Sequence, residues 1–305
     1  MSDFALPVPA KRWRVGHLLP YLLSLPSLLV CVGIVIPFVA SAIYSLQRYN
    51  LAFPTGRAFI GFGNYLSFLS DPSFWNTVEV SVIYTAATVG IELLLGLAIA
   101  LLLRERTFVN NVISVVLMLP LMTAPALASL MWKLMTNPGF GVLSWAVSLI
   151  GLNNFKWASD PHTAMLTVVL VDIWVYTPFI MILLLAGLRS LPPAPFEAAQ
   201  LDGVPARFVF FRVTLPMLSP FIVTACLFRL LDSIQQFDII YAMTQGGPGD
   251  SLMVFQVRAY LEFFQYTNVG RSAALLMVLW VITYFLSDRF VRQWHKLRER
   301  RQGHA

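Results

Sequence analysis

Two rows of side chains that can bind a polar solute interrupt the apolar stretches of this sequence. Arg229, Ser233 and Gln236 are spaced i, i+4 and i+7, so a helix would place them on one face, with Asp232 next to them. Ionisable groups at bilayer depth are unfavourable in lipid and indicate a cavity or a contact between helices. We therefore expect this face to be turned away from lipid.

The second row lies in an earlier apolar stretch. Asp172, Tyr176 and Phe179 have the same i, i+4 and i+7 spacing, and Trp174 lies next to their face. Pro178 predicts a kink in this helix. Aromatic rings stack on the C–H faces of a sugar, while carboxylates and amides bind its hydroxyl groups. The two rows together predict a sugar-binding cavity.

A purely structural role is the alternative for each of these residues. Arg229 and Asp232 are at spacing i, i+3 and can neutralise each other, while Asp172 can pair with a neighbouring helix. The rings of Tyr176 and Phe179 can simply pack within a bundle. A third possibility is that Arg229 binds a phosphate, sulfonate or carboxylate group of the substrate.

The composition indicates a membrane protein. Of the 305 residues, 58% are hydrophobic and 12% are charged, whereas roughly a quarter of the residues in soluble domains are charged. Several apolar runs exceed the length of about 20 residues that spans a bilayer. They predict six transmembrane helices, over residues 18–46, 77–103, 112–134, 163–187, 216–242 and 270–288. The resulting division is an N-terminal segment, a transmembrane domain and a basic tail, with bounds 1–17, 18–288 and 289–305.

The distribution of Lys and Arg predicts the orientation. Of the 21 such residues, fourteen lie in one set of segments between the spans and six in the opposite set, with Arg229 inside a span. Because the basic side is cytoplasmic, both termini and the 188–215 loop are predicted to be cytoplasmic. The net charge of +6 gives no indication of nucleic-acid binding. The basic tail is expected to be a solvated helix end near anionic lipid headgroups.

Three stretches break the regular pattern. Pro120 and Pro125 predict a bend in the third span. Residues 139–152 are apolar but too short to cross a bilayer, which predicts an interfacial helix or a part of the bundle. The residues TQGGPGDS at 244–251 predict a turn.

The 188–215 loop has the pattern of a short helix, a turn and a second helix. Pro193 and Pro195 suit the start of a helix, and Glu197 in its first turn complements the helix dipole. Asp202 and Gly203 predict the turn.

The second helix is predicted over 205–214. Phe208, Phe211 and Leu215 recur at spacings of three and four, which predicts an apolar stripe. The loop is therefore either a docking element for another protein or a plain amphipathic connector.

The motifs of this loop resemble the EAA motif of ABC importer permeases, which reads E-A-A, then D-G, then hydrophobic-x-L-P. The matching residues are Glu197-Ala198-Ala199, Asp202-Gly203 and Val213-Thr214-Leu215-Pro216, all in register. Val204 stands where Ala is usual. The residues TQGGP at 244–248 resemble the T-x-G-G-P turn of permeases in carbohydrate importers. The resemblance covers essentially the whole chain and is strongest to the maltose-type and glycerol-phosphate-type permeases.

The resemblance implies an all-α, polytopic type I permease fold with six transmembrane helices in the bacterial inner membrane. It implies that the loop couples to a separate ATPase subunit, with Glu197 making a polar contact and Gly203 allowing the turn. The apolar stripe would anchor the loop to the bundle of this subunit. Both polar rows fall on positions similar to the sugar-contacting segments of maltose-type permeases.

The implied partners are a second homologous permease, a pair of ATPase subunits that hold ATP and Mg, an external solute-binding protein and membrane lipid. The sequence has no G-x-x-x-x-G-K-[ST] phosphate-binding loop, so we expect that the chain is not an enzyme and holds no cofactor. We also expect no metal site, because no cysteine pair or H-E-x-x-H motif is present. The predicted function is the permease of an ATP-driven sugar importer.

Two other functions stay open. The first is an ion-coupled secondary transporter of a sugar or polyol that uses Asp172, Asp232 and Asp238 as coupling groups, although the sequence has no evident internal repeat. The second is an intramembrane enzyme with Asp172 and Asp232 as a carboxylate pair.

Overall fold

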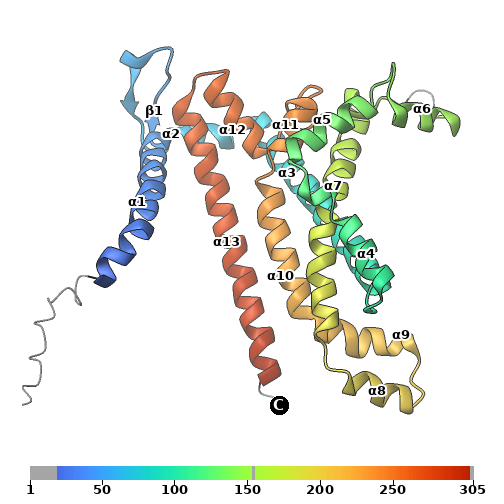
Figure 1. Cartoon of the computed structure of the whole chain (residues 1–305). Coiled ribbons are helices and arrows are strands. Elements are labelled where there is room, and N and C mark those ends of the chain that lie inside the picture. Colours follow the sequence, from blue (N-terminus) through green and yellow to red (C-terminus); the bar gives the residue numbers. More distant parts are fainter. Residues whose placement is uncertain (1–18, 153–154, 303–305) are drawn as a thin grey trace, which may run out of the picture.

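The computed structural model describes residues 19–152 and 155–302. Its frame consists of the long helices α1 (Leu19–Ser45), α3 (Pro72–Leu102), α7 (Pro161–Arg189), α10 (Leu215–Ile234) and α13 (Val269–Gln302). These helices run between two ends of the molecule (Figure 1). We call the end where α13 finishes the inner end and the opposite one the outer end. The predicted segment 1–17 and residues 303–305 of the predicted tail lie outside the described residues.

Shorter elements occupy the two ends (Figure 1). Strands β1 (Gln47–Arg48) and β2 (Ala58–Phe59) form an antiparallel hairpin at the outer end, with Gln47 opposite Phe59. This hairpin is the exception to the predicted all-α fold. The outer helices are α2 (Gly63–Leu69), α6 (Val142–Leu149), α11 (Asp238–Thr244) and α12 (Phe255–Phe264), and the inner ones are α8 (Ala194–Leu201) and α9 (Ala206–Val209). Short 3-10 turns occupy Pro54–Gly56 and Trp157–Ser159.

The third predicted span, 112–134, is divided. It consists of α4 (Phe108–Leu117), a 3-10 turn (Pro120–Met122) and α5 (Pro125–Met135). Both prolines stand at the start of a new piece, because proline has no N–H group for a helical hydrogen bond. Within the described residues, five helices are long and apolar enough to cross a membrane. The number of six spans therefore stays a prediction.

The fifth predicted span, 216–242, has other bounds in the structure. One helical run covers Ala206–Ile234 and joins α9, a π-helical segment (Phe210–Thr214) and α10. The separate helix predicted over 205–214 is thus the first part of this run, because a π-helical turn carries the helix into Pro216. The predicted turn at 244–251 is confirmed: α11 ends at Thr244, and Gln245 has a φ of +56°.

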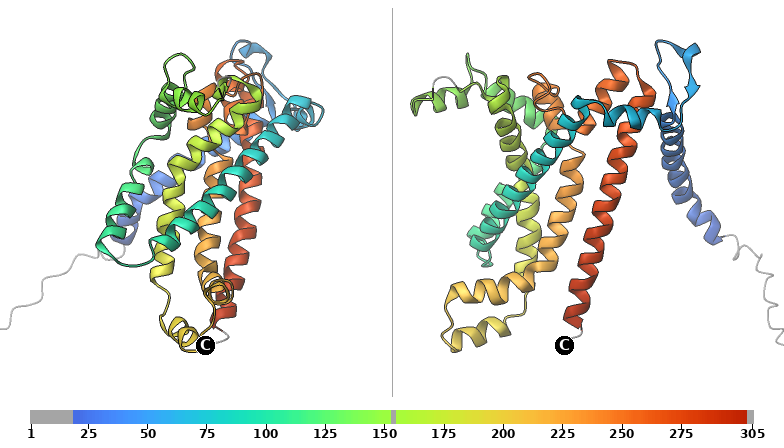
Figure 2. Two further views of the ribbon diagram at one scale, coloured as in Figure 1. Left: turned by 90° about the vertical axis from the view of Figure 1, so that its right-hand side faces the viewer. Right: turned by 180° about the vertical axis from the view of Figure 1, so that it is seen from behind.

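Helices α3, α7 and α10 pack at the centre. The contact of α3 with α7 is the most extensive between two helices in the described chain, and the two cross in Figure 2. A Cβ atom at Gly96 would lie 2.7 Å from Cγ2 of Ile180, and one at Gly187 would lie 2.6 Å from Cγ of Phe221. These glycines let the backbones approach closely, as small residues do between membrane helices.

Helix α1 is nearly uncovered. It contacts α13, but 0% of its most apolar window is buried, and its first part diverges from α13 (Figure 1). A helix that is apolar on all sides requires a membrane or another protein around it.

Candidate functional site

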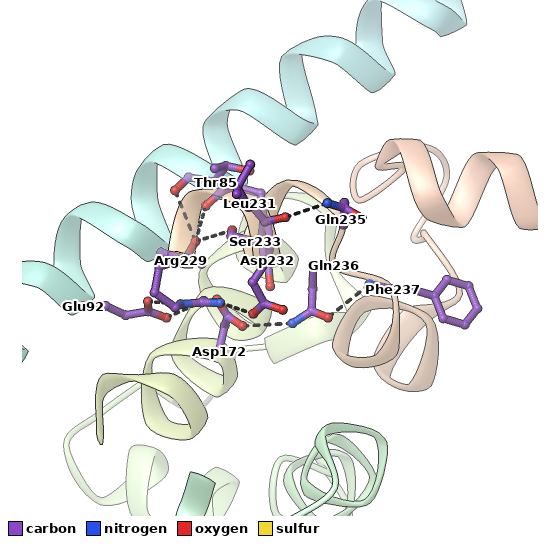
Figure 3. Close-up of polar contacts among 12 residues, drawn as sticks. Thr85, Glu92, Asp172, Arg229, Leu231, Asp232, Ser233, Gln235, Gln236 and Phe237 are labelled. Carbon is purple, nitrogen blue, oxygen red and sulfur yellow. Dashed lines mark hydrogen bonds and ion pairs between the residues drawn. The ribbon is translucent and has the colours of Figure 1, made fainter. Parts of the chain in front are cut away.

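Arg229 lies at the centre of a buried charge cluster, where α3, α7 and α10 meet (Figure 3). Its Nε donates to Oε2 of Glu92 at 2.6 Å, and its Nη2 donates to Oε1 of the same carboxylate at 2.9 Å. Nη2 also donates to Oδ2 of Asp172 at 2.7 Å, and Nη1 donates to Asp232. The side chains of Glu92 and Asp172 are 0% exposed. One guanidinium group thus joins three helices.

Hydrogen bonds from uncharged side chains extend this charge cluster. Nε2 of Gln236 donates to Oδ1 of Asp172 at 3.1 Å, and its Oε1 accepts from the N–H of Phe237 at 3.1 Å. The hydroxyl groups of Ser233 and Thr88 lie 2.9 Å apart and join α10 to α3. Gln236 follows the end of α10, so the helical spacing argument holds only for the other two members of its row.

Aromatic rings of α7 lie beside the charge cluster. The guanidinium carbon of Arg229 is 4.1 Å from the ring centre of Tyr176, a cation–π contact. Phe179 packs edge-on against a ring of α10, and Trp174 does so against Trp132 of α5. Tyr176 and Phe179 therefore face α10, whereas Trp174 faces α5. The predicted sugar-binding cavity stays a prediction.

The charge cluster leaves no free donor nitrogen on Arg229. Its Nε, Nη1 and Nη2 each donate to a carboxylate, and three carboxylates surround the one cation. An anionic substrate group on Arg229 does not fit this arrangement, because two buried carboxylates already compensate the guanidinium charge and the group would have to displace Asp232 from Nη1. The ion pairs with Asp232 and Asp172 that the sequence offered as the structural alternative are present.

The charge cluster reaches the surface at Asp232, whose side chain is 53% exposed. Trp174 is 38% exposed, and Tyr176 and Phe179 are half-buried. We call these four residues the accessible face. The other four residues predicted to bind substrate are enclosed within the subunit: Asp172, Arg229, Ser233 and Gln236.

Sequence reasoning missed Glu92 and Thr88. Glu92 lies within the apolar run 77–103 that was predicted as the second span. The rule that a charge at bilayer depth needs a partner would have selected it. No comparable signal marks Thr88, because a threonine hydroxyl can bond to the preceding turn of its own helix.

The loop between α7 and α10 has the predicted turn. Gly203 has a φ of +64°, its N–H donates to the carbonyl of Gln200 at 3.2 Å, and the N–H of Val204 donates to the carbonyl of Ala199 at 3.0 Å. This pair of hydrogen bonds is the Schellman motif that ends a helix. A residue without Cβ suits the left-handed backbone that the motif requires, which explains the glycine of the D-G pair.

Helix α8 presents its acidic residues to solvent. Glu197, Ala198 and Asp202 are exposed and Ala199 is half-buried. The N-cap of α8 is Pro193, which provides no side-chain hydrogen bond. Within the described chain, the Glu197 carboxylate has no hydrogen-bond or ion-pair partner. This carboxylate is therefore accessible to another molecule.

The apolar stripe does not anchor the loop to the bundle of this subunit, contrary to the prediction. Phe208 and Phe211 are 53% and 54% exposed. The reason is that α9 lies across the end of α10 and beside α8 rather than against α3 or α7 (Figure 1). Half of each ring is left for other contacts.

Within residues 19–152 and 155–302, no group of three or more His, Cys, Asp or Glu side chains is placed to hold a metal ion. The carboxylates of the charge cluster are instead paired with Arg229.

A bundle of apolar helices with a buried charge cluster and an exposed helical loop at its inner end is the architecture of a multi-pass membrane protein. The chain belongs to the family of binding-protein-dependent transport system inner membrane components, whose family model matches residues 92–296. It is a transport component of an ABC importer in the inner membrane rather than an enzyme. Members of this family work with a solute-binding protein and with a separate ATPase, which hydrolyses the ATP.

Similar proteins span nearly the whole chain. The trehalose/maltose transport system permease protein MalF of Thermococcus litoralis is 34% identical over 90% of this chain and 95% of its own length. The trehalose transport system permease protein SugA of Mycobacterium tuberculosis is 34% identical over 90% of this chain and 88% of its own length. The fold is similar to that of a chain in a bacterial alginate ABC transporter, with a TM-score of 0.77, 19% identity, and coverage of 90% of this chain and 94% of that chain.

Proposed function

We propose that this chain is the permease subunit of an ATP-driven importer of a neutral sugar or sugar derivative. The observation that carries the proposal is the accessible face, where the exposed Asp232 carboxylate and the Tyr176 ring both contact Arg229, and where Phe179 and Trp174 of the same helix as Tyr176 are partly exposed. A few polar groups among apolar and aromatic side chains are typical of small-molecule sites. The similar permeases of trehalose/maltose and trehalose systems support the same class of solute.

The charges at this face support a neutral solute. Arg229 is enclosed, so the charge that a solute meets is the Asp232 carboxylate. A hydroxyl group can donate to that carboxylate, whereas a phosphate or sulfonate group would be repelled by it. The test uses vesicles that contain the full complex and its binding protein. We expect trehalose or maltose to inhibit uptake of the transported solute by competition, and glycerol phosphate not to inhibit it.

Two variants test the accessible face. Asp232→Asn and Trp174→Ala should each raise the solute concentration for half-maximal uptake by roughly tenfold, as expected for the loss of one hydrogen bond to a charged group or one ring contact. Trp145→Ala is the matched control, because Trp145 is 64% exposed but belongs to α6 at the outer end. Unchanged half-maximal concentrations in both variants would assign these residues to packing alone.

The proposed coupling element is loop 188–215, with α8 as the part that docks on the ATPase. Support comes from the exposed Glu197 and Ala198, and from the Schellman turn at Gly203 that separates α8 from α9. Glu197→Lys should leave the complex assembled in the membrane and abolish solute-dependent ATP hydrolysis and uptake. Gln200→Lys, at another exposed position of α8, is the control for the added positive charge. Full uptake by Glu197→Lys would refute the coupling role.

The proposed assembly contains a second homologous permease and two ATPase subunits that bind ATP and Mg. The uncovered α1 supports a second permease, since its apolar surface is available to another chain as well as to lipid. Purification of the tagged chain from membranes should yield two different permeases and an ATPase. Uptake in vesicles that contain this chain without any ATPase would instead favour the ion-coupled transporter.

A further inference from the structure

Arg189, the last residue of α7, is bonded to the inner end of α3. Its Nη2 donates to the carbonyl of Leu103 at 2.9 Å and to that of Glu105 at 3.3 Å, and its Nε donates to the carbonyl of Arg104 at 3.3 Å. Carbonyl groups at a helix C-terminus lack helical partners and carry partial negative charge. One guanidinium group thus binds three consecutive carbonyls just after α3.

The connection also runs in the opposite direction. Nη2 of Arg106 donates to the carbonyl of Arg189 at 3.2 Å, at the C-terminus of α7. The ends of α3 and α7 therefore each receive an arginine from the other segment. Leu103 and Leu188 are both buried in one apolar cluster beneath these hydrogen bonds, so the two ends rest on a packed base.

A third contact extends this arrangement to α8. The guanidinium carbon of Arg104 is 4.8 Å from the ring centre of Phe196, a cation–π contact. Phe196 immediately precedes Glu197 in α8. Without this contact, α8 is joined to α7 through Ser190–Pro193, a short stretch outside the helices.

We infer that Arg104, Arg106 and Arg189 form an arginine clamp that fixes α8 to the inner end of α3. These three residues are positioning residues for transport. Through the clamp, a displacement of α8 moves α3 and α7 together, and these two helices carry Glu92 and Asp172 of the charge cluster. The inference rests on the proposed docking of α8 on an ATPase.

The residue type matches this role. The guanidinium group is a rigid, planar fork of several donors, whereas the ammonium group of lysine is a compact point charge. Three carbonyls at different positions suit the fork and not the point charge. Lysine at position 189 should therefore restore only part of the function that alanine removes.

Spin labels can measure the position of α8 directly. Labels are attached at Leu102→Cys in α3 and Gln200→Cys in α8, both at exposed positions, after Cys31 and Cys226 have been replaced. In the full complex, we expect a narrow distance distribution. Arg189→Ala should broaden it and Arg189→Lys should give an intermediate width. Arg289→Ala, which removes an exposed arginine of α13, should not change it. An unchanged distribution in Arg189→Ala overturns the inference.

A second measurement separates the clamp from the docking of α8. We expect Arg189→Ala to retain basal ATP hydrolysis but to consume roughly tenfold more ATP per solute, the factor for the loss of a hydrogen bond to a charged group. Arg189→Lys should recover part of this ratio. If Glu197→Lys uncouples ATP hydrolysis from uptake but Arg189→Ala consumes the normal amount of ATP per solute, the clamp alone is overturned. Normal uptake by Glu197→Lys overturns the docking proposal itself.

Discussion

At the scale of single residues, the positive charge of Arg229 is stabilised by carboxylates rather than by solvent. Its guanidinium group is 1% exposed and is surrounded by two fully buried carboxylates and one exposed carboxylate. Removing one partner of a buried ion pair leaves an uncompensated charge in an apolar environment, which is more harmful than replacing the whole pair. The residues of the charge cluster should therefore contribute differently to the stability of the protein, according to how deeply each is buried.

This difference can be tested by stability. Arg229→Met should lower the stability of the purified complex by about 3–5 kcal/mol, because Glu92 and Asp172 would stay buried without a cation. Asp232→Asn should have a much smaller effect, since this side chain is 53% exposed and solvent screens its charge. Thermal unfolding in detergent measures both variants. Equal losses would contradict the assignment of Arg229 to the buried centre.

Gly203 gives a second prediction at the residue scale. A Cβ at this position meets no atom within 4 Å, so only the φ of +64° disfavours a side chain. Gly203→Ala should therefore cost about 1–2 kcal/mol at this turn and lower uptake, while Gly203→Asn should retain more uptake because asparagine tolerates the left-handed region. Equal uptake by the alanine variant and the natural protein would show that the turn is not constrained.

At the scale of elements, the contact between α3 and α7 depends on a close backbone approach. Gly96 and Gly90 both lie in α3, but a Cβ would lie 2.7 Å from Ile180 at Gly96 and would meet nothing within 4 Å at Gly90. The two glycines therefore have different roles although the sequence makes them look alike.

The pair provides a matched experiment. Gly96→Ala should destabilise the protein, because the added methyl group forces α3 away from α7, and overpacking typically costs about 1–3 kcal/mol. Gly90→Ala should be neutral or stabilising by up to about 1 kcal/mol, since alanine favours a helix over glycine. Thermal unfolding of the two variants tests these expectations. A Gly90→Ala variant less stable than Gly96→Ala would contradict the packing of these helices.

At the scale of the whole molecule, the orientation in the membrane follows from the distribution of basic residues. The predicted cytoplasmic loop lies at the inner end, together with the end of α13 (Figure 1). The orientation can be tested in cells that produce a variant without Cys31 and Cys226, to which a membrane-impermeant maleimide is applied from outside. The maleimide should label Gln265→Cys, which follows α12, and should not label Gln200→Cys in α8. The opposite labelling pattern would reverse the predicted orientation.

Sequence reasoning predicted the loop turn better than the helix bounds around it. The D-G pair specifies a left-handed turn through local backbone sterics, and Gly203 has this conformation. Pro216 stands in the first turn of α10, but the helical run already begins at Ala206, so the predicted start of the fifth span at residue 216 was too late. Pro120 and Pro125 indicated a bend, but the extent of the break depends on how the 3-10 turn (Pro120–Met122) and α5 pack against α7.

By itself, the sequence determined the properties that depend on local spacing and composition. These are the apolar helices, the turn at 202–203 and the need of Arg229 for a partner, since a charge in an apolar helix is unfavourable alone. Only the tertiary structure decided which partner it has. Glu92 is 137 residues away along the chain, and the packing of α3, α7 and α10 brings it to the guanidinium group. The same packing encloses Arg229 and leaves Asp232 exposed, because the direction of each side chain relative to its neighbouring helices is a property of the assembled bundle.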